Sequence, residues 1–129
     1  MIGLGSDMLD IRRIEKTFNK FGNRFRDRIF TRNEIEKCEK RSQKISCYAK
    51  RFAAKEAASK ALGTGFRKGV YWKDLEVVNM PSGKPTIKFY GNSRTHLLNL
   101  ISKEKTPEVS LTITDEYPYA QAIVTISSR

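Results

Sequence analysis

The stretch that decides the fold runs from residue 51 to residue 65 and reads Arg51-Phe52-Ala53-Ala54-Lys55-Glu56-Ala57-Ala58-Ser59-Lys60-Ala61-Leu62-Gly63-Thr64-Gly65. It predicts the clearest helix of the chain, from about Ser46 to Leu62, ended by Gly63 because glycine commonly follows a helix. At about 100° per residue, one face carries only small side chains, at Ala54, Ala57, Ala58 and Ala61. Another element can therefore approach this face closely, either within the chain or from a second subunit.

The roughly opposite side of this helix carries an acid and a base. Glu56 and Lys60 are four residues apart, so their side chains can meet, and Phe52 and Ala53 border them. One interpretation is an ordinary surface ion pair, which stabilises a helix by about 0.2–0.5 kcal/mol. The other is a reactive acid and base that share a partly apolar strip. Spacing alone leaves both open.

Asp7 is the second candidate for chemistry. Residues 2–8 are apolar and glycine-rich, which predicts a buried strand that ends at Asp7, where a carboxylate must face solvent, a partner or a metal. Asp10 stands at the expected start of a helix over Asp10 to Phe21 and can cap it. One Asp and one Glu can hold Mg2+, which commonly takes one or two carboxylates together with waters and substrate phosphates. The only histidine, His96, has no candidate partner in the sequence and is expected to be structural or exposed.

The remaining elements define the fold class. Thr31-Arg32-Asn33-Glu34 matches a capping box and predicts a helix to about Arg41. Alternating residues predict four strands, at Leu75–Asn79, Thr86–Tyr90, Glu108–Thr114 and Ala120–Ser127. A further helix is expected between the second and third of these strands, over Asn92–Lys103. The order strand, helices, hairpin, helix, hairpin predicts one α+β domain over residues 1–129 with a mainly antiparallel sheet.

The chain is strongly basic. Its 129 residues include 25 Lys and Arg against 14 Asp and Glu, a net charge of +11, and the basic residues concentrate between Arg12 and Arg51. Such a charge favours an anionic partner: a nucleic acid, an anionic membrane, a polyphosphate ligand or an acidic protein. No apolar run approaches the roughly 20 residues that span a bilayer, and the N-terminus lacks the basic leader of a secretory signal. We therefore expect a cytoplasmic protein in which Cys38 and Cys47 are reduced thiols.

The residues alone leave three functions open: a group transferase, a Mg2+-dependent phosphoester hydrolase, and a small nucleic-acid-binding protein. The third is favoured by the charge and by the aromatic residues Tyr48, Phe66, Tyr71 and Trp72. The sequence contains no recognised nucleic-acid motif, and its basic residues do not interleave with aromatic ones as in a stacking platform. The glycines from Gly63 to Gly69 match neither a P-loop nor a dinucleotide fingerprint, although this loop could offer N–H groups to a phosphate.

Several motifs resemble one family. Gly3-Leu4-Gly5-Ser6-Asp7-Met8-Leu9-Asp10-Ile11 resembles the N-terminal motif of the holo-acyl-carrier-protein synthases, and residues 51–65 resemble their signature helix almost without a break. Phe30–Glu34, Ser82–Pro85 and Tyr119–Val124 are also similar, in the right order. The resemblance implies the α+β phosphopantetheinyl transferase fold, with the sheet packed on the long helix. It also implies a trimer with active sites at subunit interfaces.

The resemblance further implies a reaction and roles for residues. Phosphopantetheine would pass from coenzyme A to a serine of an acidic apo acyl carrier protein for fatty acid biosynthesis, leaving 3′,5′-ADP. Asp7 and Glu56 would hold Mg2+, Glu56 could accept the serine proton directly or through a water, and Lys60 would stabilise the departing phosphate. Residues implied to bind coenzyme A are Arg51, Lys55, Lys60, Gly63, Lys44 and Thr112, with Gly83, Lys84 and Pro85 from the neighbouring subunit. The carrier would meet Arg12, Arg13, Arg24 and Arg28.

One position departs from the family pattern. Many members have a histidine after a Ser-x-Thr sequence in the penultimate strand, whereas Ser110-Leu111-Thr112 is followed here by Ile113. We therefore assign no catalytic histidine, and Thr112 is the remaining candidate for a nucleotide contact from this strand.

Overall fold

The computed structural model describes residues 1–129, which form five strands, five α-helices and one 3-10 helix. In chain order these are β1 (Gly3–Asp10), α1 (Ile11–Phe21), α2 (Asn23–Ile29), α3 (Arg32–Glu39), α4 (Lys44–Leu62), η1 (Trp72–Asp74), β2 (Leu75–Asn79), β3 (Pro85–Phe89), α5 (Gly91–Asn99), β4 (Pro107–Glu116) and β5 (Tyr119–Ser128). The predicted α+β class is confirmed. No helix has both the length and the apolar character needed to cross a membrane.

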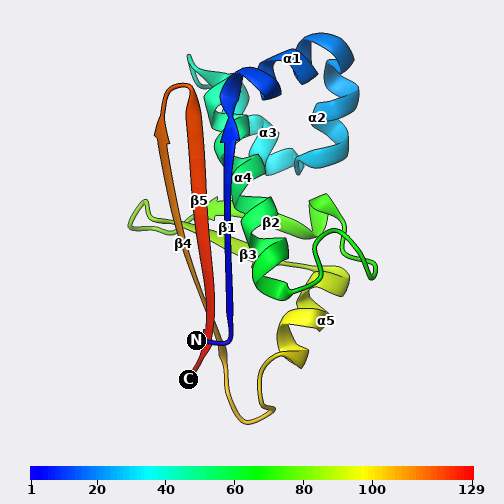
Figure 1. Cartoon of the computed structure of the whole chain (residues 1–129), viewed down its shortest axis with the longest axis vertical. Helices are drawn as coiled ribbons and strands as arrows, with labels where there is room; N and C mark the ends of the chain where they lie inside the picture. The colour runs from blue at the N-terminus through cyan, green and yellow to red at the C-terminus, as the bar shows by residue number, and fades with distance from the viewer.

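The centre of the fold is the contact between β1 and α4. A three-stranded antiparallel sheet in the order β1-β5-β4 lays β1 along α4 (Figure 1). Gly3 and Gly5 face the helix, and a side chain at either position would overlap the carbonyl oxygen of Ala61 or Ala57. Ala54, Ala57, Ala58 and Ala61 are buried, so the small-residue face of α4 packs within the chain. The absence of side chains lets strand and helix meet backbone to backbone.

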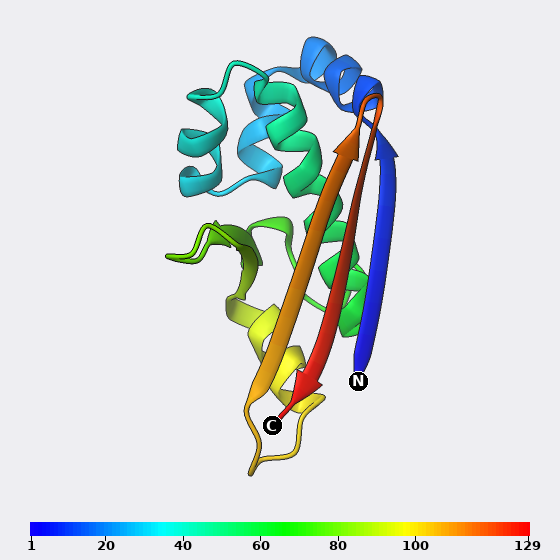
Figure 2. The same cartoon turned by 90° about the vertical axis from the view of Figure 1, so that its left-hand side faces the viewer.

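The core continues between α4 and both sheets. Ala122, Val124 and Ile126 of β5 cover the helix from the first sheet, and β2 and β3 form a separate two-stranded antiparallel sheet whose buried residues join the same core. The expectation of one mainly antiparallel sheet is thus corrected to two antiparallel sheets. The helices lie to one side of the three-stranded sheet or at its end (Figure 2). Its other face exposes Leu4, Met8 and Ile123.

A buried ion pair holds α3 to α4, in the upper part of Figure 1. Lys55 and Glu34 are both fully buried, with their charged atoms 2.6 Å apart. Lys55 Nζ also donates to the backbone carbonyls of Ile29 and Trp72, at 2.8 and 3.1 Å. Glu34 accepts from the backbone N–H groups of Thr31 and Val77, so every charged atom of the pair has polar partners.

Four details differ from the sequence-based expectations. Strand β1 continues past Asp7 to Asp10, and its alternate residues are exposed, so it is not a buried strand that ends at Asp7. Neither helix α2 nor η1 is predicted from the sequence, because each is short. Lys55 binds the carbonyl at the end of α2 and the carbonyl at the start of η1, and these contacts cannot be read from the local sequence. Helix α5 ends at Asn99 rather than Lys103, because the chain tightens there: Ile101 N–H donates to the Leu98 carbonyl, and Ile101 itself is buried in the core beyond the helix. Cys38 and Cys47 form a disulfide between α3 and α4, which corrects the expectation of reduced thiols.

Candidate functional site

Strand β1 and helix α4 bring Asp7, Glu56 and Lys60 together. Asp7 lies two residues beyond Gly5, so the alternation of the strand points it toward α4 as well. Lys60 Nζ donates to Asp7 Oδ1 at 3.1 Å and to the Ser6 carbonyl at 3.0 Å. The ion pair between Glu56 and Lys60 that their spacing allows is not formed, because Lys60 turns to the strand instead. The interpretation of Glu56 and Lys60 as a surface ion pair is therefore wrong.

Asp7 and Glu56 open onto one cavity of about 370 Å³ between β1, α1, α2 and α4. Burial raises the pKa of Glu56, the negative charge of Asp7 raises it further, and Lys60 opposes this shift. A carboxyl group with a raised pKa is suited to accept a proton near neutral pH. The remaining lining residues are Met8, Leu9, Asp10, Arg13, Ile14, Thr17, Phe25 and Phe52.

These two carboxylates fit a magnesium ion. They share one cavity, and Glu56 has no cationic partner in a salt bridge, so its charge is available to a cation. No group of three or more His, Cys, Asp or Glu side chains forms an alternative metal site. Two carboxylates leave most of an octahedral shell to water and phosphate oxygens, which is the usual pattern for Mg2+.

An aromatic stack walls the site and was missed in the sequence. Phe52, which faces the carboxylate cavity, stacks on Trp72 with ring centroids 4.7 Å apart, and Trp72 stacks on Phe66 at 3.8 Å. The only sequence signal was that Phe52 lies one helical turn before Glu56. Phe66 and Trp72 stack on each other and are half-buried, and Tyr48 is buried, so Tyr71 is the only exposed one of the four aromatic residues considered for nucleic acid.

Arg51 lies on a second cavity, of about 190 Å³. It is five residues before Glu56, which turns it about 140° away around α4. The guanidinium is buried; its Nη1 donates to Cys47 Sγ at 3.0 Å, and its Nε has no partner. Burial lowers the pKa of Arg51, although an arginine stays charged in proteins. The other lining residues are Arg41, Cys47, Lys50, Val77, Asn79, Pro85, Ile113 and Asp115.

Pro85 reaches the Arg51 cavity from within the same chain. Gly83 and Lys84 precede it in the exposed β2–β3 turn. Ile113, at the position where the family resemblance leads us to expect a histidine, lines this cavity too. Thr112 lies next to Ile113 on β4 and is exposed on the uncovered face of the sheet, so within one chain it does not reach Arg51.

The position of Lys55 corrects the role in coenzyme A binding that the resemblance implied for it. Its side chain is fully buried, and its ammonium group is occupied by Glu34 and two backbone carbonyls. An ammonium group has three donors, so none remains for a phosphate. Lys55 therefore holds the fold together and does not bind coenzyme A as the resemblance implied. Gly63, in contrast, is exposed at the end of α4 in the left-handed conformation, with φ +82°.

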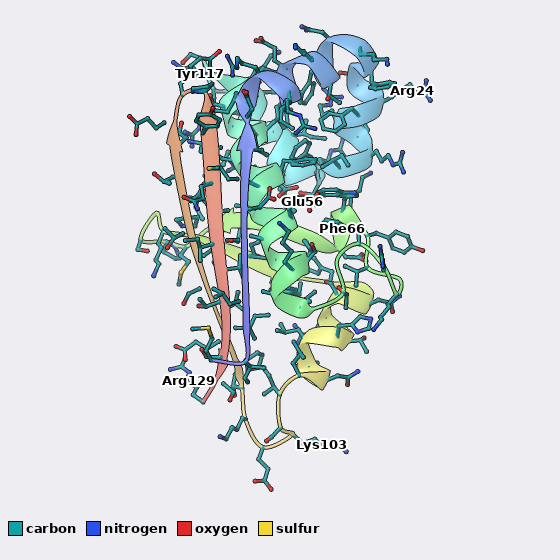
Figure 3. All side chains as sticks on the ribbon, viewed as in Figure 1. Arg24, Glu56, Phe66, Lys103, Tyr117 and Arg129 are labelled. Atoms are coloured by element: carbon teal, nitrogen blue, oxygen red, sulfur yellow. A yellow bond between two sulfur atoms is a disulfide. The ribbon has the colours of Figure 1, made fainter.

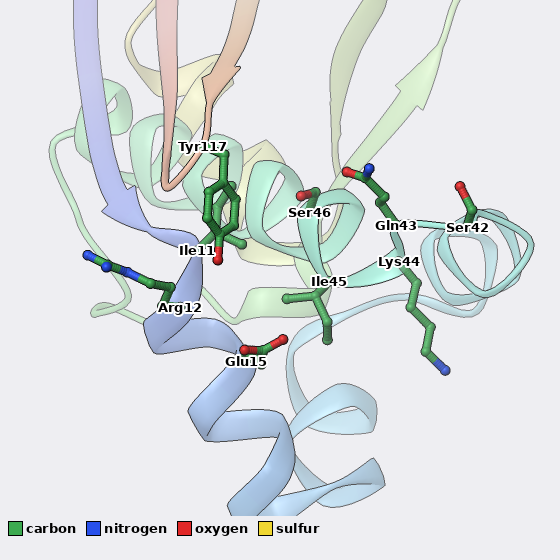
Figure 4. Close-up of a pocket in the computed structure, with 9 residues that line it drawn as sticks. All are labelled: Ile11, Arg12, Glu15, Ser42, Gln43, Lys44, Ile45, Ser46 and Tyr117. Carbon is green, nitrogen blue, oxygen red and sulfur yellow. The ribbon is translucent and has the colours of Figure 1, made fainter.

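Lys44 and Arg12 line a third and larger cavity, of about 550 Å³, between the start of α1, the start of α4 and the β4–β5 turn (Figure 4). Their side chains point away from each other, and Lys44 forms a salt bridge with Glu39 at 3.4 Å. This cavity contains neither Asp7, Glu56 nor Arg51. The structure thus does not bring Lys44 to the other residues implied to bind coenzyme A.

The four arginines implied to meet the carrier differ in whether an acidic residue of the chain already binds them. Arg12 binds Asp10 through two nitrogens, at 3.0 and 2.6 Å, and this hydrogen bonding lowers the pKa of Asp10 to about 2. Arg13, Arg24 and Arg28 are exposed on α1 and α2, and Arg24 projects from the outer side of α2 (Figure 3). They make no salt bridge with acidic residues of the chain. Their charge is therefore available to a partner.

The chain as a whole is similar to known proteins. The family model described as the 4'-phosphopantetheinyl transferase superfamily matches residues 3–122. The chain belongs to this superfamily. A holo-[acyl-carrier-protein] synthase of Brucella ovis is 52% identical over 128 residues, covering 99% of this chain and 96% of that protein. The resemblance inferred from the motifs is thereby confirmed.

Solved structures of the family share the whole architecture. A holo-[acyl-carrier-protein] synthase from Neisseria meningitidis is 34% identical with a TM-score of 0.84, covering 98% of each chain. One from Helicobacter pylori, solved in complex with coenzyme A, is 31% identical with a TM-score of 0.78, covering 96% of this chain and 99% of that chain. The α+β transferase fold therefore extends over nearly all of this chain.

The raised pKa of Glu56 predicts a pH-dependent cost to stability. Because the folded protein holds this proton more tightly than the unfolded chain, stability falls as pH rises through the raised pKa. Glu56→Gln removes the titration. We expect its gain in unfolding free energy over the unmodified protein to be larger near pH 7 than near pH 4. Urea unfolding with a chelator present measures this, and exposed Glu104→Gln serves as the control. An equal effect at both pH values would contradict the assigned environment of Glu56.

Proposed function

We propose that this protein transfers 4′-phosphopantetheine from coenzyme A to a serine of an apo acyl carrier protein, as a cytoplasmic enzyme that supplies fatty acid biosynthesis. The observation that carries the proposal is that Asp7 and Glu56 share one cavity, with Lys60 bonded to Asp7, in a chain of this superfamily. The nucleic-acid alternative loses its aromatic platform to internal stacking. A phosphoester hydrolase would need the same carboxylates but no exposed basic face for a protein.

The residues divide the work of the transfer. Glu56, whose pKa is raised, accepts the proton of the carrier serine as its oxygen attacks the phosphorus next to the pantetheine arm. Lys60 stabilises the negative charge that develops on the departing 3′,5′-ADP, and its bond to the Ser6 carbonyl holds it in place. Asp7 and Glu56 are the residues that would hold Mg2+, which would supply neutralisation of the pyrophosphate charge.

Coenzyme A would need a site for its nucleotide end and a site for its reacting phosphate, and these two sites lie apart within a single chain. The Arg51 cavity, with Arg41 and Lys50, suits the anionic nucleotide end, whereas the reacting phosphate must lie at Asp7 and Glu56. These two cavities share no lining residue and lie on different flanks of α4. A neighbouring subunit that brings its Arg51 cavity to this chain's carboxylates would complete the site. Gly83, Lys84 and Pro85 of that neighbour would then border the nucleotide.

The uncovered face of the three-stranded sheet is the surface through which we propose that a trimer forms. Leu4, Met8 and Ile123 are 58%, 65% and 39% exposed on this one face, and apolar side chains gathered on one face favour contact with a partner. Tyr119 extends this surface along β5, and Thr112 lies on it. In such a trimer Thr112 would face a neighbouring subunit and could contact a nucleotide bound there, which it cannot do within a single chain.

The reaction is tested by the intact mass of an apo acyl carrier protein after incubation with the protein, coenzyme A and Mg2+. We expect the mass to increase by one phosphopantetheine and the increase to disappear with a chelator. Glu56→Gln should lower the rate by about 10²–10⁴-fold, since it removes both a proton acceptor and a charged ligand. A carrier whose mass stays unchanged, although an established transferase modifies it, would refute the proposal.

The composite site is tested by mixing subunits. Glu56→Gln and Arg51→Gln variants should each be nearly inactive alone, while co-expressed and purified together they should recover about one quarter of the native activity, because random mixed trimers contain sites with both native residues. A double variant that carries both changes in one chain, co-expressed with either single variant, is the control and should stay inactive. No recovery from mixed oligomers would place Glu56 and Arg51 in the same subunit's site.

The proposed carrier-binding surface, formed by the exposed Arg13, Arg24 and Arg28 of α1 and α2, is tested by charge reversal on α2. Arg24→Glu with Arg28→Glu should raise the KM for the carrier about tenfold or more at low salt and leave the KM for coenzyme A within about twofold, since complementary charge governs encounter with an acidic protein. Lys103→Glu with Lys105→Glu makes the same charge change at the far end of the molecule, where Lys103 lies in Figure 3, and should change neither constant. Equal losses for both pairs would indicate only a net-charge effect.

A further inference from the structure

The disulfide between Cys38 and Cys47 lies beside the Arg51 cavity. Cys38 is near the end of α3 and Cys47 is in the first turn of α4, nine residues later. Cys47 Sγ accepts the hydrogen bond from Arg51 Nη1 at 3.0 Å and lines the Arg51 cavity. It also lines a neighbouring cavity of about 210 Å³ with Arg41 and Lys50. Cys47, which is 4% exposed, thus borders two cavities, whereas Cys38 is fully buried and borders neither.

The surroundings make Cys47 the reactive member of the pair. Arg41, Lys50 and Arg51 line the cavities that reach it, and one carboxylate, Asp115, balances them through a salt bridge with Lys50. Cations next to a cysteine stabilise its thiolate, which is the form that attacks a disulfide. Cys38 is held in position to attack Cys47 in turn, because the two sulfurs are already bonded in this arrangement.

We propose that Cys38 and Cys47 are a reversible redox pair and that closing the disulfide tightens the binding of the nucleotide end of coenzyme A in the Arg51 cavity. The identity of the ligand rests on the proposed function; the redox chemistry does not. In the oxidation, the Cys47 thiolate attacks one sulfur of a low-molecular-weight disulfide and displaces a thiolate. Cys38, losing its proton, then attacks Cys47 Sγ and displaces the second thiolate. The protein loses two electrons, and the small disulfide becomes two thiols.

Two contacts couple the redox state to the cavity. In the reduced protein a Cys47 thiolate would form an ion pair with Arg51 and compete with a phosphate for the guanidinium, whereas a disulfide sulfur is uncharged and leaves the charge of Arg51 to the ligand. The disulfide also closes the turn that carries Arg41, so less conformational entropy is lost when this arginine meets a phosphate.

Reduction should remain local. Tyr48 O–H donates to Glu39 at 2.6 Å, which joins α3 to α4 one residue beyond each cysteine. Burial and this contact raise the pKa of Tyr48, so the hydroxyl keeps its proton throughout the physiological range. The buried Lys55–Glu34 pair joins the same two helices. The fold therefore does not depend on the disulfide, and the two redox states differ mainly around Arg41 and Arg51.

The redox pair is tested by equilibrating the protein in glutathione buffers of varied redox ratio, blocking free thiols with N-ethylmaleimide and measuring intact mass. We expect a reversible change between two added maleimide groups and none. The same mass across all buffers would overturn the proposal. Binding of 3′,5′-ADP, measured by calorimetry without any carrier, should be at least about fivefold tighter for the oxidised form. Equal affinity of the two forms would overturn the coupling.

Cys47→Ser is the matched variant, because it removes both the internal disulfide and the thiol that borders the Arg51 cavity, and it leaves only the buried Cys38. With its melting temperature checked, it should bind 3′,5′-ADP with the same affinity at every redox ratio, whereas the affinity of the native protein changes. An affinity of Cys47→Ser that still follows the redox ratio would contradict the proposal. Measuring carrier modification in parallel separates the redox coupling from the proposed function. If the carrier is modified but the affinity for 3′,5′-ADP does not depend on the redox state, only the redox coupling is refuted. If the affinity depends on the redox state but no carrier is modified, only the proposed function is refuted.

Discussion

The structure depends on the backbone contact between β1 and α4. Gly3 and Gly5 have no side chains, and the facing residues of α4 are alanines, so the strand lies directly on the helix. The contact is apolar and tightly packed, which leaves little freedom for either element to shift. Asp7 follows on the same side of the strand, and Lys60 follows on the helix. The position of the charged residues is therefore fixed by an uncharged contact one turn away.

A second constraint holds the opposite flank of α4. Lys55 joins the ends of three other segments through Glu34, Ile29 and Trp72. A buried ion pair is costly to break by removing one partner, about 3–5 kcal/mol, because the other charge is left uncompensated. Lys55 and Glu56 are adjacent in the chain, yet one is fully buried and the other faces a cavity. Helix α4 thus anchors the aromatic wall with one residue and presents the reactive carboxylate with the next.

The positive charge is divided between two kinds of surface. Arg13, Arg24 and Arg28 lie on an exposed face of α1 and α2, which suits a large acidic partner, whereas Arg51 is recessed with Arg41 and Lys50 around a small cavity, which suits a phosphate. A recessed cation in a low-dielectric site interacts more strongly with an anion than an exposed one. The basic residues that contribute to the net charge of +11 thus include exposed arginines on two helices and a recessed group around a cavity.

The sequence by itself determined the α+β class, the long helix from about Ser46 to Leu62, the alanine face, the capping box at Thr31 and the family, because these depend on local periodicity and on motifs of neighbouring residues. It also pointed to Asp7, Glu56 and Lys60 through those motifs. Only the tertiary structure decided that Lys60 meets Asp7 rather than Glu56, and that Lys55 is buried against Glu34. The same holds for the Cys38–Cys47 disulfide and for the separate cavities of Arg51 and Glu56. Each of these depends on segments distant in sequence or on which flank of α4 is covered, and a local pattern gives the spacing of side chains along a helix but not what lies against each flank.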